Sequence, residues 1–258
     1  MLIEESHLEF VSKNMLPSLV RDLDRILRRQ PNVPGEHESI TVGRLLLIVL
    51  ALGIISGVQL GAFSLIRTWL VPEQALGNHW IQPLASAVKL PLLFLLTLVV
   101  TVPSLYVFNA LFGPRLSLSI IIKTLMSSLA VTFAVLASLL PIAVFFCFST
   151  PNYLFMKLLY VFFAAAAGCL GVVYLLRLLR VNISAFETPA EEDRQQPGYP
   201  TMLFAFWTLF FALVGSQMGW IMRPFIGNPD LPFTWFRTPE NNVFMDLAQS
   251  IWKLIGGS

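Results

Sequence analysis

Residues 45 to 66 of the chain read LLLIVLALGIISGVQLGAFSLI. The run contains no charged side chain, and Arg44 and Arg67 bound it on either side. About 20 predominantly apolar residues are enough for an α-helix to cross the hydrocarbon core of a bilayer. This stretch therefore predicts a membrane-spanning helix.

Four more runs of the same kind follow along the chain. The five predicted spans cover residues 45–66, 90–112, 118–146, 153–176 and 202–222. Overall, 56% of the residues are hydrophobic, 12% are charged and the mean hydropathy is +0.72, whereas a soluble domain carries about 25% charged residues. We therefore predict an all-α fold, a polytopic transmembrane helix bundle of about five spans.

Amphipathic segments flank the predicted spans at both ends of the chain. Apolar residues recur at three- and four-residue spacing over residues 5–29, and Phe244, Leu247 and Ile251 share one face of a short segment near the end. Both patterns predict interfacial helices. The predicted domains are a cytoplasmic amphipathic tail at 1–42, a five-span transmembrane domain at 43–226, and a distal loop with an interfacial helix at 227–258.

The amphipathic tail carries a basic cluster formed by Arg21, Arg25, Arg28 and Arg29. Such a cluster beside an apolar stripe suits the anionic headgroups of a membrane surface. A helix that binds a protein partner would show the same pattern, so both interpretations stay open.

Basic residues also predict the orientation of the spans. They are denser in the tail and in the loop at 177–194 than in the connections that would lie on the opposite side, and the denser side is usually cytoplasmic. We expect a multi-pass protein of the bacterial inner (plasma) membrane, with a cytoplasmic amino terminus and a periplasmic carboxyl terminus.

Small residues in two spans predict close helix packing. Gly53, Gly57 and Gly61 form one row in the first span, and Gly215 and Gly219 lie one turn apart in the fifth. Helix association in lipid depends on close backbone approach, which such rows allow. Packing within one chain is the expected use, ahead of a dimer seam.

A few polar residues fall within or beside the spans. Gln59, Asn109 and Gln217 are predicted to form hydrogen bonds between helices, with contact to a substrate as the alternative. Lys89 lies at the estimated start of the second span, where its stem is expected to extend and leave the ammonium group among the headgroups. Pro103 should kink that span, as fixed geometry or as a hinge.

No pattern in the sequence predicts an enzyme. His7, His37 and His79 lie outside the predicted spans and lack metal-binding spacing, and no nucleophile, phosphate-loop or metalloprotease motif is present. The net charge of +2 does not suggest a nucleic-acid surface. We expect no catalytic residue, no cofactor and no metal site, and no nucleic-acid partner.

The segment after the fifth span is rich in aromatic residues and prolines. Its candidate residues are Trp220, Arg223, Pro224 and Trp235. Aromatic residues and arginine occur in the anchoring belts of membrane proteins and also in binding hot spots. Both roles are kept as alternatives for this segment.

Four short segments carry a resemblance to a known family: KLP at 89–91, PSLYVFN at 103–109, GSQMGW at 215–220 and RPFIG at 223–227. Together with the five-span layout, they resemble bacterial inner-membrane proteins of the Yip-like kind over residues 45–236. The eukaryotic Yip proteins bind small trafficking GTPases and shape membranes. For this chain the resemblance implies the five-span fold, and it brings no catalytic residue.

The expected function is that of a non-enzymatic membrane scaffold or accessory subunit of a membrane protein complex. Its expected partners are membrane lipids and either another membrane protein or further copies of the chain. The alternative is a channel or transporter, with a path between kinked spans lined by Thr97, Ser128, Thr132 and Gln217. No Asp or Glu lies within the five predicted spans, which disfavours the usual carboxylate relay of cation-coupled transport.

Overall fold

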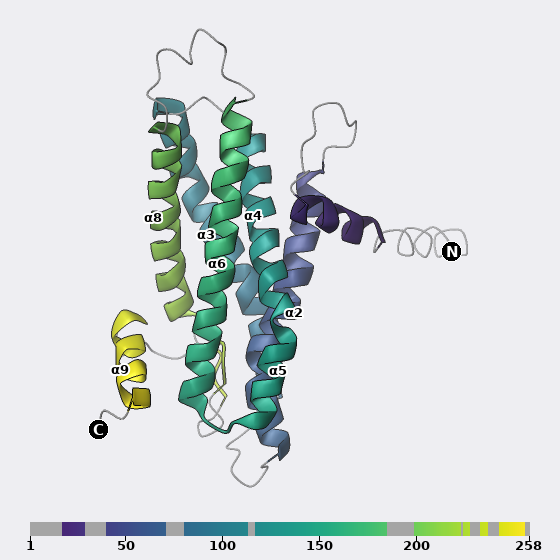
Figure 1. The fold of residues 1–258 in the computed structure, drawn as a ribbon, viewed down its shortest axis with the longest axis vertical. Helices are drawn as coiled ribbons and strands as arrows, with labels where there is room; N and C mark the ends of the chain where they lie inside the picture. The colour runs from purple at the N-terminus through teal and green to yellow at the C-terminus, as the bar shows by residue number, and fades with distance from the viewer. Residues whose placement is uncertain are drawn as a thin grey trace, which may run out of the picture.

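A computed structural model describes residues 17–28, 40–70, 80–112, 117–184, 199–222, 224–227, 233–236 and 243–255. Its helices are residues 17–27, α2 (Val42–Leu70), α3 (Ile81–Phe112), α4 (Leu118–Ser138), α5 (Leu140–Ser149), α6 (Tyr153–Ser184), α8 (Tyr199–Ile221) and α9 (Val243–Ile255) (Figure 1). These residues include no β-strand, and the fold is all-α as predicted.

Within the described residues, four helical stretches are long and apolar enough to cross a membrane. They are Val42–Leu70, Ile81–Val107, Leu118–Ser149 and Tyr153–Asn182. In α8 the described apolar part is shorter, Phe206–Gly219. A helix satisfies its backbone hydrogen bonds internally, as hydrocarbon requires. The chain is a multi-pass membrane protein, and α8 is its candidate fifth span.

The long helices run up and down side by side (Figure 1). α2 packs against α3, α4 and α5, while α4 packs against α6 and α3 packs against α8. The helix at 17–27 lies at one side of the bundle, steeply inclined to α2 near the start of that helix, and α9 lies toward the opposite end beside α6 and α8 (Figure 1). The two short helices therefore mark the two ends of the bundle.

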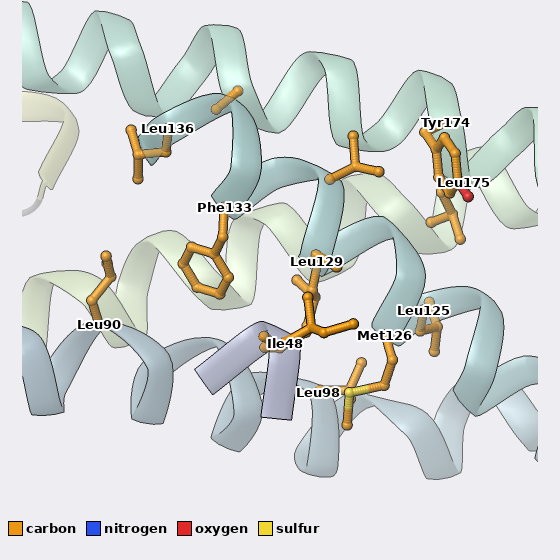
Figure 2. Packing of buried hydrophobic residues seen from close by; sticks show 14 of the residues in the cluster. Ile48, Leu90, Leu98, Leu125, Met126, Leu129, Phe133, Leu136, Tyr174 and Leu175 are labelled. Atoms are coloured by element: carbon orange, nitrogen blue, oxygen red, sulfur yellow. The ribbon is translucent and has the colours of Figure 1, made fainter. Parts of the chain in front are cut away.

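The core is formed where α2, α3, α4 and α6 face one another. Figure 2 shows Ile48, Leu98, Met126 and Leu129 pointing into the same space, and all four belong to one cluster of buried apolar residues. Phe133 is fully buried and its ring meets that of Phe94 edge to face, with 5.0 Å between centroids. Residues of this kind lock the helices by close packing, which is what holds a bundle together in lipid.

α2 packs extensively and closely against α3, and glycine makes this approach possible. A methyl group on Gly57 would collide with the backbone of Ser86 and Ala87, and one on Gly61 would collide with the backbone at Pro83. A methyl group on Gly53 would come within 2.9 Å of the Pro91 side chain on α3. The predicted glycine row thus faces α3 within one chain, at the level where α3 begins.

Two helix boundaries differ from the sequence-based prediction. α3 begins at Ile81, about two turns before the predicted start at residue 90. The predicted third span is divided at Leu139 into α4 and α5, with Pro141 in the first turn of α5. Proline lacks the N–H that would continue the helical ladder, so a break just before it is expected.

Candidate functional site

The first half of α3 carries a row of polar side chains. Gln82, Ser86 and Lys89 follow one another at four- and three-residue spacing, so they share one face of the helix. All three are buried. They face residues 224–227 and 233–236, which follow α8 and are called the distal segment below.

Gln82 and Ser86 bind the first part of the distal segment. The Gln82 Nε2 atom donates to the carbonyl oxygens of Pro224 at 3.1 Å and Phe225 at 2.9 Å. The Ser86 hydroxyl donates to the same Phe225 oxygen at 2.5 Å and receives a bond from Gln82 at 3.3 Å. Backbone carbonyls that no helix or sheet satisfies are therefore paired with side chains of α3.

Lys89 binds the second part of the distal segment. Its Nζ atom donates to the carbonyl oxygen of Trp235 and lies 3.5 Å from that of Pro224. The same atom lies 5.7 Å from the ring centroid of Trp235 and 4.9 Å from that of Phe236. Carbonyl oxygens and aromatic faces both present partial negative charge, so they offset part of the cost of burying the ammonium ion.

The groups around the Lys89 ammonium group are electron-rich and would repel an anion. In the described part of the chain, no carboxylate forms an ion pair with Lys89, and the groups that surround it are carbonyl oxygens and ring faces. An incoming anion would meet those electron-rich groups as well as the ammonium ion. The arrangement is thus suited to holding the chain's own distal segment, and it is poorly suited to binding an anionic substrate.

The depth of Lys89 sets it apart from a surface lysine. Trp69 and Trp80 are exposed at the end of α2 and just before α3, where tryptophan typically marks the membrane interface. Lys89 lies about 12 Å along the helix axis beyond Ile81. The distal segment therefore turns back toward the bundle at membrane depth, where irregular backbone is tolerated only when protein or water satisfies it.

Gly227 fixes the distal segment at the α2–α3 crossing. A methyl group at this position would collide with the side chain of Ser64 on α2 and approach that of Gln82 on α3. Gly227 itself is buried. The segment thus rests on the same crossing that the glycine row of α2 makes possible.

Three of the residues singled out from the sequence meet at this site, namely Lys89, Pro224 and Trp235. No protein-family model, curated protein or solved structure matches the chain. The Yip-like resemblance therefore stays a prediction, and the role of this site rests on its geometry.

The other candidates lie elsewhere. Pro103 lies within continuous α3, and Gln217 is half-buried in α8. Gly215 and Gly219 of α8 contact Thr97 and Leu93 of α3, with room for a methyl group. Outside the described residues or side chains are Arg223, Asn109, Trp220, Arg29, Phe244, Leu247, His7, His37 and His79.

Lys89 differs from its sequence-based interpretation. The prediction placed its ammonium group among the headgroups, whereas the side chain is only 2% exposed. The reason is that α3 begins two turns earlier than expected, which carries Lys89 inward, and that the distal segment covers it. The hydrogen bonds to backbone carbonyls replace the water that an extended lysine would have reached.

Gln82 and Ser86 were missed by the sequence analysis because residues 67–89 were read as a connection between spans. A signal was nevertheless present. The spacing of Gln82, Ser86 and Lys89 defines one polar face of a helix, and Ala85 and Ala87 between them favour close packing. Their hydrogen-bond partners in the distal segment could not be predicted, because these lie at least 135 positions later in the chain.

Gln59 lies apart from this site, inside the bundle. Its side chain is 1% exposed, and neither its Nε2 nor its Oε1 atom has a hydrogen-bond partner among the described residues. Its backbone oxygen accepts a hydrogen bond from the Tyr160 hydroxyl at 2.8 Å, and that hydroxyl lies 3.7 Å from the Cys147 sulfur. An unpaired buried amide is unfavourable by about 1–3 kcal/mol per polar group.

The hydroxyl groups expected to line a path bond to the bundle itself. Thr97 and Thr132 each donate to the carbonyl oxygen one turn earlier, at 2.8 and 3.0 Å. The Ser128 hydroxyl donates to the carbonyl oxygen of Gly171 on α6 at 2.8 Å. These groups are buried and act in helix packing.

Proposed function

We propose that the chain is a non-enzymatic membrane scaffold or accessory subunit whose distal segment presents a binding surface to another membrane protein. The observation that carries the proposal is the hold of Lys89 on Trp235 and Phe236. Although Lys89 binds the backbone oxygen of Trp235 and lies over the ring of Phe236, the Trp235 residue remains 50% exposed and Phe236 62% exposed. Aromatic side chains on a rigid support have the composition and the order of a binding hot spot.

The hydrogen bonds of polar side chains in the spans support a static role. Thr97, Ser128 and Thr132 use their hydroxyls within the bundle. The Asn182 amide does the same, donating to Thr124 at 3.1 Å. Ser128 and Asn182 tie α4 to α6, whereas Thr97 and Thr132 bond within their own helices. A bundle whose polar groups are paired in this way has the features of a support for partners.

The test is purification of the tagged chain from its native membrane in mild detergent, followed by mass spectrometry of what remains bound. We expect a stoichiometric partner that is lost from the double variant Trp235→Ala/Phe236→Ala. The matched control is Trp69→Ala, because Trp69 is also an exposed tryptophan at the same end of the bundle. Retention of the partner by the double variant, or recovery of the chain alone, contradicts the proposal.

The proposed location is the bacterial inner membrane with a cytoplasmic amino terminus. The basic residues at the end of the bundle where α2 begins support this orientation. Impermeant labelling of single cysteines at Ser39 and Ser258 tests it, with label expected from the outer side at Ser258 alone. Equal labelling at the two positions contradicts an odd number of spans.

A channel or transporter is the second candidate, and Gln59 is the observation that favours it. A buried amide with no partner among the described residues is the kind of group that a polar path or ligand would use. Reconstituted liposomes test this function directly. Solute or ion flux above background that changes in Gln59→Met supports the channel, whereas background flux in the parent protein rejects it.

A further inference from the structure

The helix at residues 17–27 is held firmly on the bundle. Leu19, Leu23 and Ile26 lie on one face and pack against the core, with Ile26 fully buried. The Tyr174 hydroxyl of α6 donates to the backbone oxygen of Ile26 at 3.1 Å. These contacts fix which face of the helix looks inward.

An ion pair adds to this attachment. Asp22 is buried, and its Oδ2 atom lies 3.3 Å from the Nη1 atom of Arg44 at the start of α2. The pair links the helix to the point where the first span begins. The remaining faces of the helix therefore have a defined orientation.

The outward faces combine exposed apolar and basic side chains. Val20 is 65% exposed and Leu27 is 47% exposed, and their seven-residue spacing places them on one stripe. Arg21 and Arg28 form the adjacent stripe and are also exposed. Exposed apolar side chains beside arginines are typical of a helix that lies in a membrane interface.

Some arginines of this helix form no ion pair with a described acidic residue. Arg28 pairs with Asp24 at 2.8 Å, and Asp22 pairs with Arg44. Arg21 and Arg25 form no ion pair with a described acidic residue. Among the described residues, this surface therefore carries two arginines without an acidic partner.

We infer that this surface docks onto an anionic phospholipid leaflet, with Val20 and Leu27 at the acyl boundary and Arg21 and Arg25 among the headgroup phosphates. The helix lies steeply inclined to the bundle beside the start of α2 (Figure 1), where the first span begins, so a leaflet surface lies at this level. Lipid fits better than a protein partner because arginines beside the apolar pair match an anionic headgroup layer over acyl chains. The inference is independent of the scaffold role of the distal segment.

The test uses the full chain in nanodiscs with an environment-sensitive fluorophore on Val20→Cys in a Cys169→Ala background. Cys147 is buried and is left in place, and the same background without Val20→Cys measures any unwanted labelling. One set of discs contains phosphatidylcholine alone, and the other also contains phosphatidylglycerol. Lipids that carry a quencher near the headgroup report whether the probe lies in the interface.

We expect quenching in both sets of discs, because the bundle holds the helix at the level of the leaflet, and stronger quenching when the quencher is carried by phosphatidylglycerol, which Arg21 and Arg25 attract. Arg21→Gln/Arg25→Gln should lower this preference for phosphatidylglycerol over phosphatidylcholine by about tenfold. The matched control is Arg177→Gln/Arg180→Gln, which removes two exposed arginines from α6 toward the same end of the bundle. This control should leave the quenching unchanged.

Three outcomes overturn the inference. The first is a probe that lipid does not quench in either disc, and the second is quenching that ignores both phosphatidylglycerol and the Arg21/Arg25 pair. The third is a probe that lipid leaves unquenched in discs but that is shielded from an aqueous quencher in native membranes, because a protein partner then covers this face.

Discussion

The Nε2 atom of Gln82 lies 2.9 Å from the carbonyl oxygen of Phe225, a residue 143 positions later in the chain. The same side chain also binds the Pro224 oxygen and the Ser86 hydroxyl. One buried amide thus connects the start of α3 to the segment that follows α8.

Replacing Gln82 by Leu should destabilise the protein by about 1–3 kcal/mol, because carbonyl groups of the distal segment lose their donor while they remain buried. Thermal unfolding of the purified protein in detergent measures the effect. Gln217→Leu is the control, since Gln217 is only half-buried on α8, and it should change the stability by less than about 0.5 kcal/mol. Equal effects from the two variants would contradict the role given to Gln82.

Replacing Lys89 by Met should release the distal segment without greatly changing the overall stability. The loss of hydrogen bonds to Trp235 and Pro224 is offset because a buried cation no longer has to be desolvated. The rate at which Thr234→Cys reacts with a maleimide reagent measures the release, and we expect it to rise by about tenfold or more for a loosened segment.

The control for this experiment is Lys253→Met, which removes an exposed lysine from α9. It should leave the labelling rate of Thr234→Cys unchanged. A slow rate in both variants would mean that packing alone holds the distal segment.

Replacing Gly57 by Ala should destabilise the bundle by about 1–3 kcal/mol through overpacking. The added methyl group meets the backbone of Ser86 and Ala87, which cannot move as a side chain can. Gly219→Ala in α8 is the matched variant, because its methyl group would lie 3.5 Å from Leu93 in ordinary contact. Thermal unfolding compares the two, and a similar loss in both would refute the crossing as the site of close approach.

Replacing Gln59 by Met should leave the stability unchanged or raise it by about 1 kcal/mol, since a buried amide without a described partner is exchanged for an apolar group of similar length. Thermal unfolding again gives the sign. A clear loss of stability would show that the amide has a partner in the membrane, such as a bound water or ligand, and would strengthen the channel interpretation.

Much of the fold follows from hydropathy alone. The first span was predicted from residues 45–66 and lies within α2, and residues 153–176 lie within α6. Apolar runs of this length have few alternatives in a bilayer, so their identity as helices is strongly determined. The break before Pro141 also has a local cause, although the sequence did not show that α4 and α5 would separate there.

The candidate site was less accessible from sequence. Lys89, Pro224 and Trp235 were each noted, but nothing in the local pattern relates residues that lie 135 and 146 positions apart. The start of α3 was also misplaced, because Gln82, Ser86 and Lys89 lower the hydropathy of its first turns. Polar side chains at the start of a helix usually indicate exposure to water, whereas here they form hydrogen bonds with the distal segment.

Lys89 is synthesised well before Trp235, whose carbonyl oxygen it binds. At about 5–20 residues per second of synthesis, the 146 residues between them separate their appearance by about 7–30 s. During this interval α3 must enter the membrane with a lysine whose carbonyl partners have not been made. The translocon, lipid headgroups or water must accommodate the charge until the distal segment has been made, so this segment closes onto α3 well after α3 itself has been synthesised.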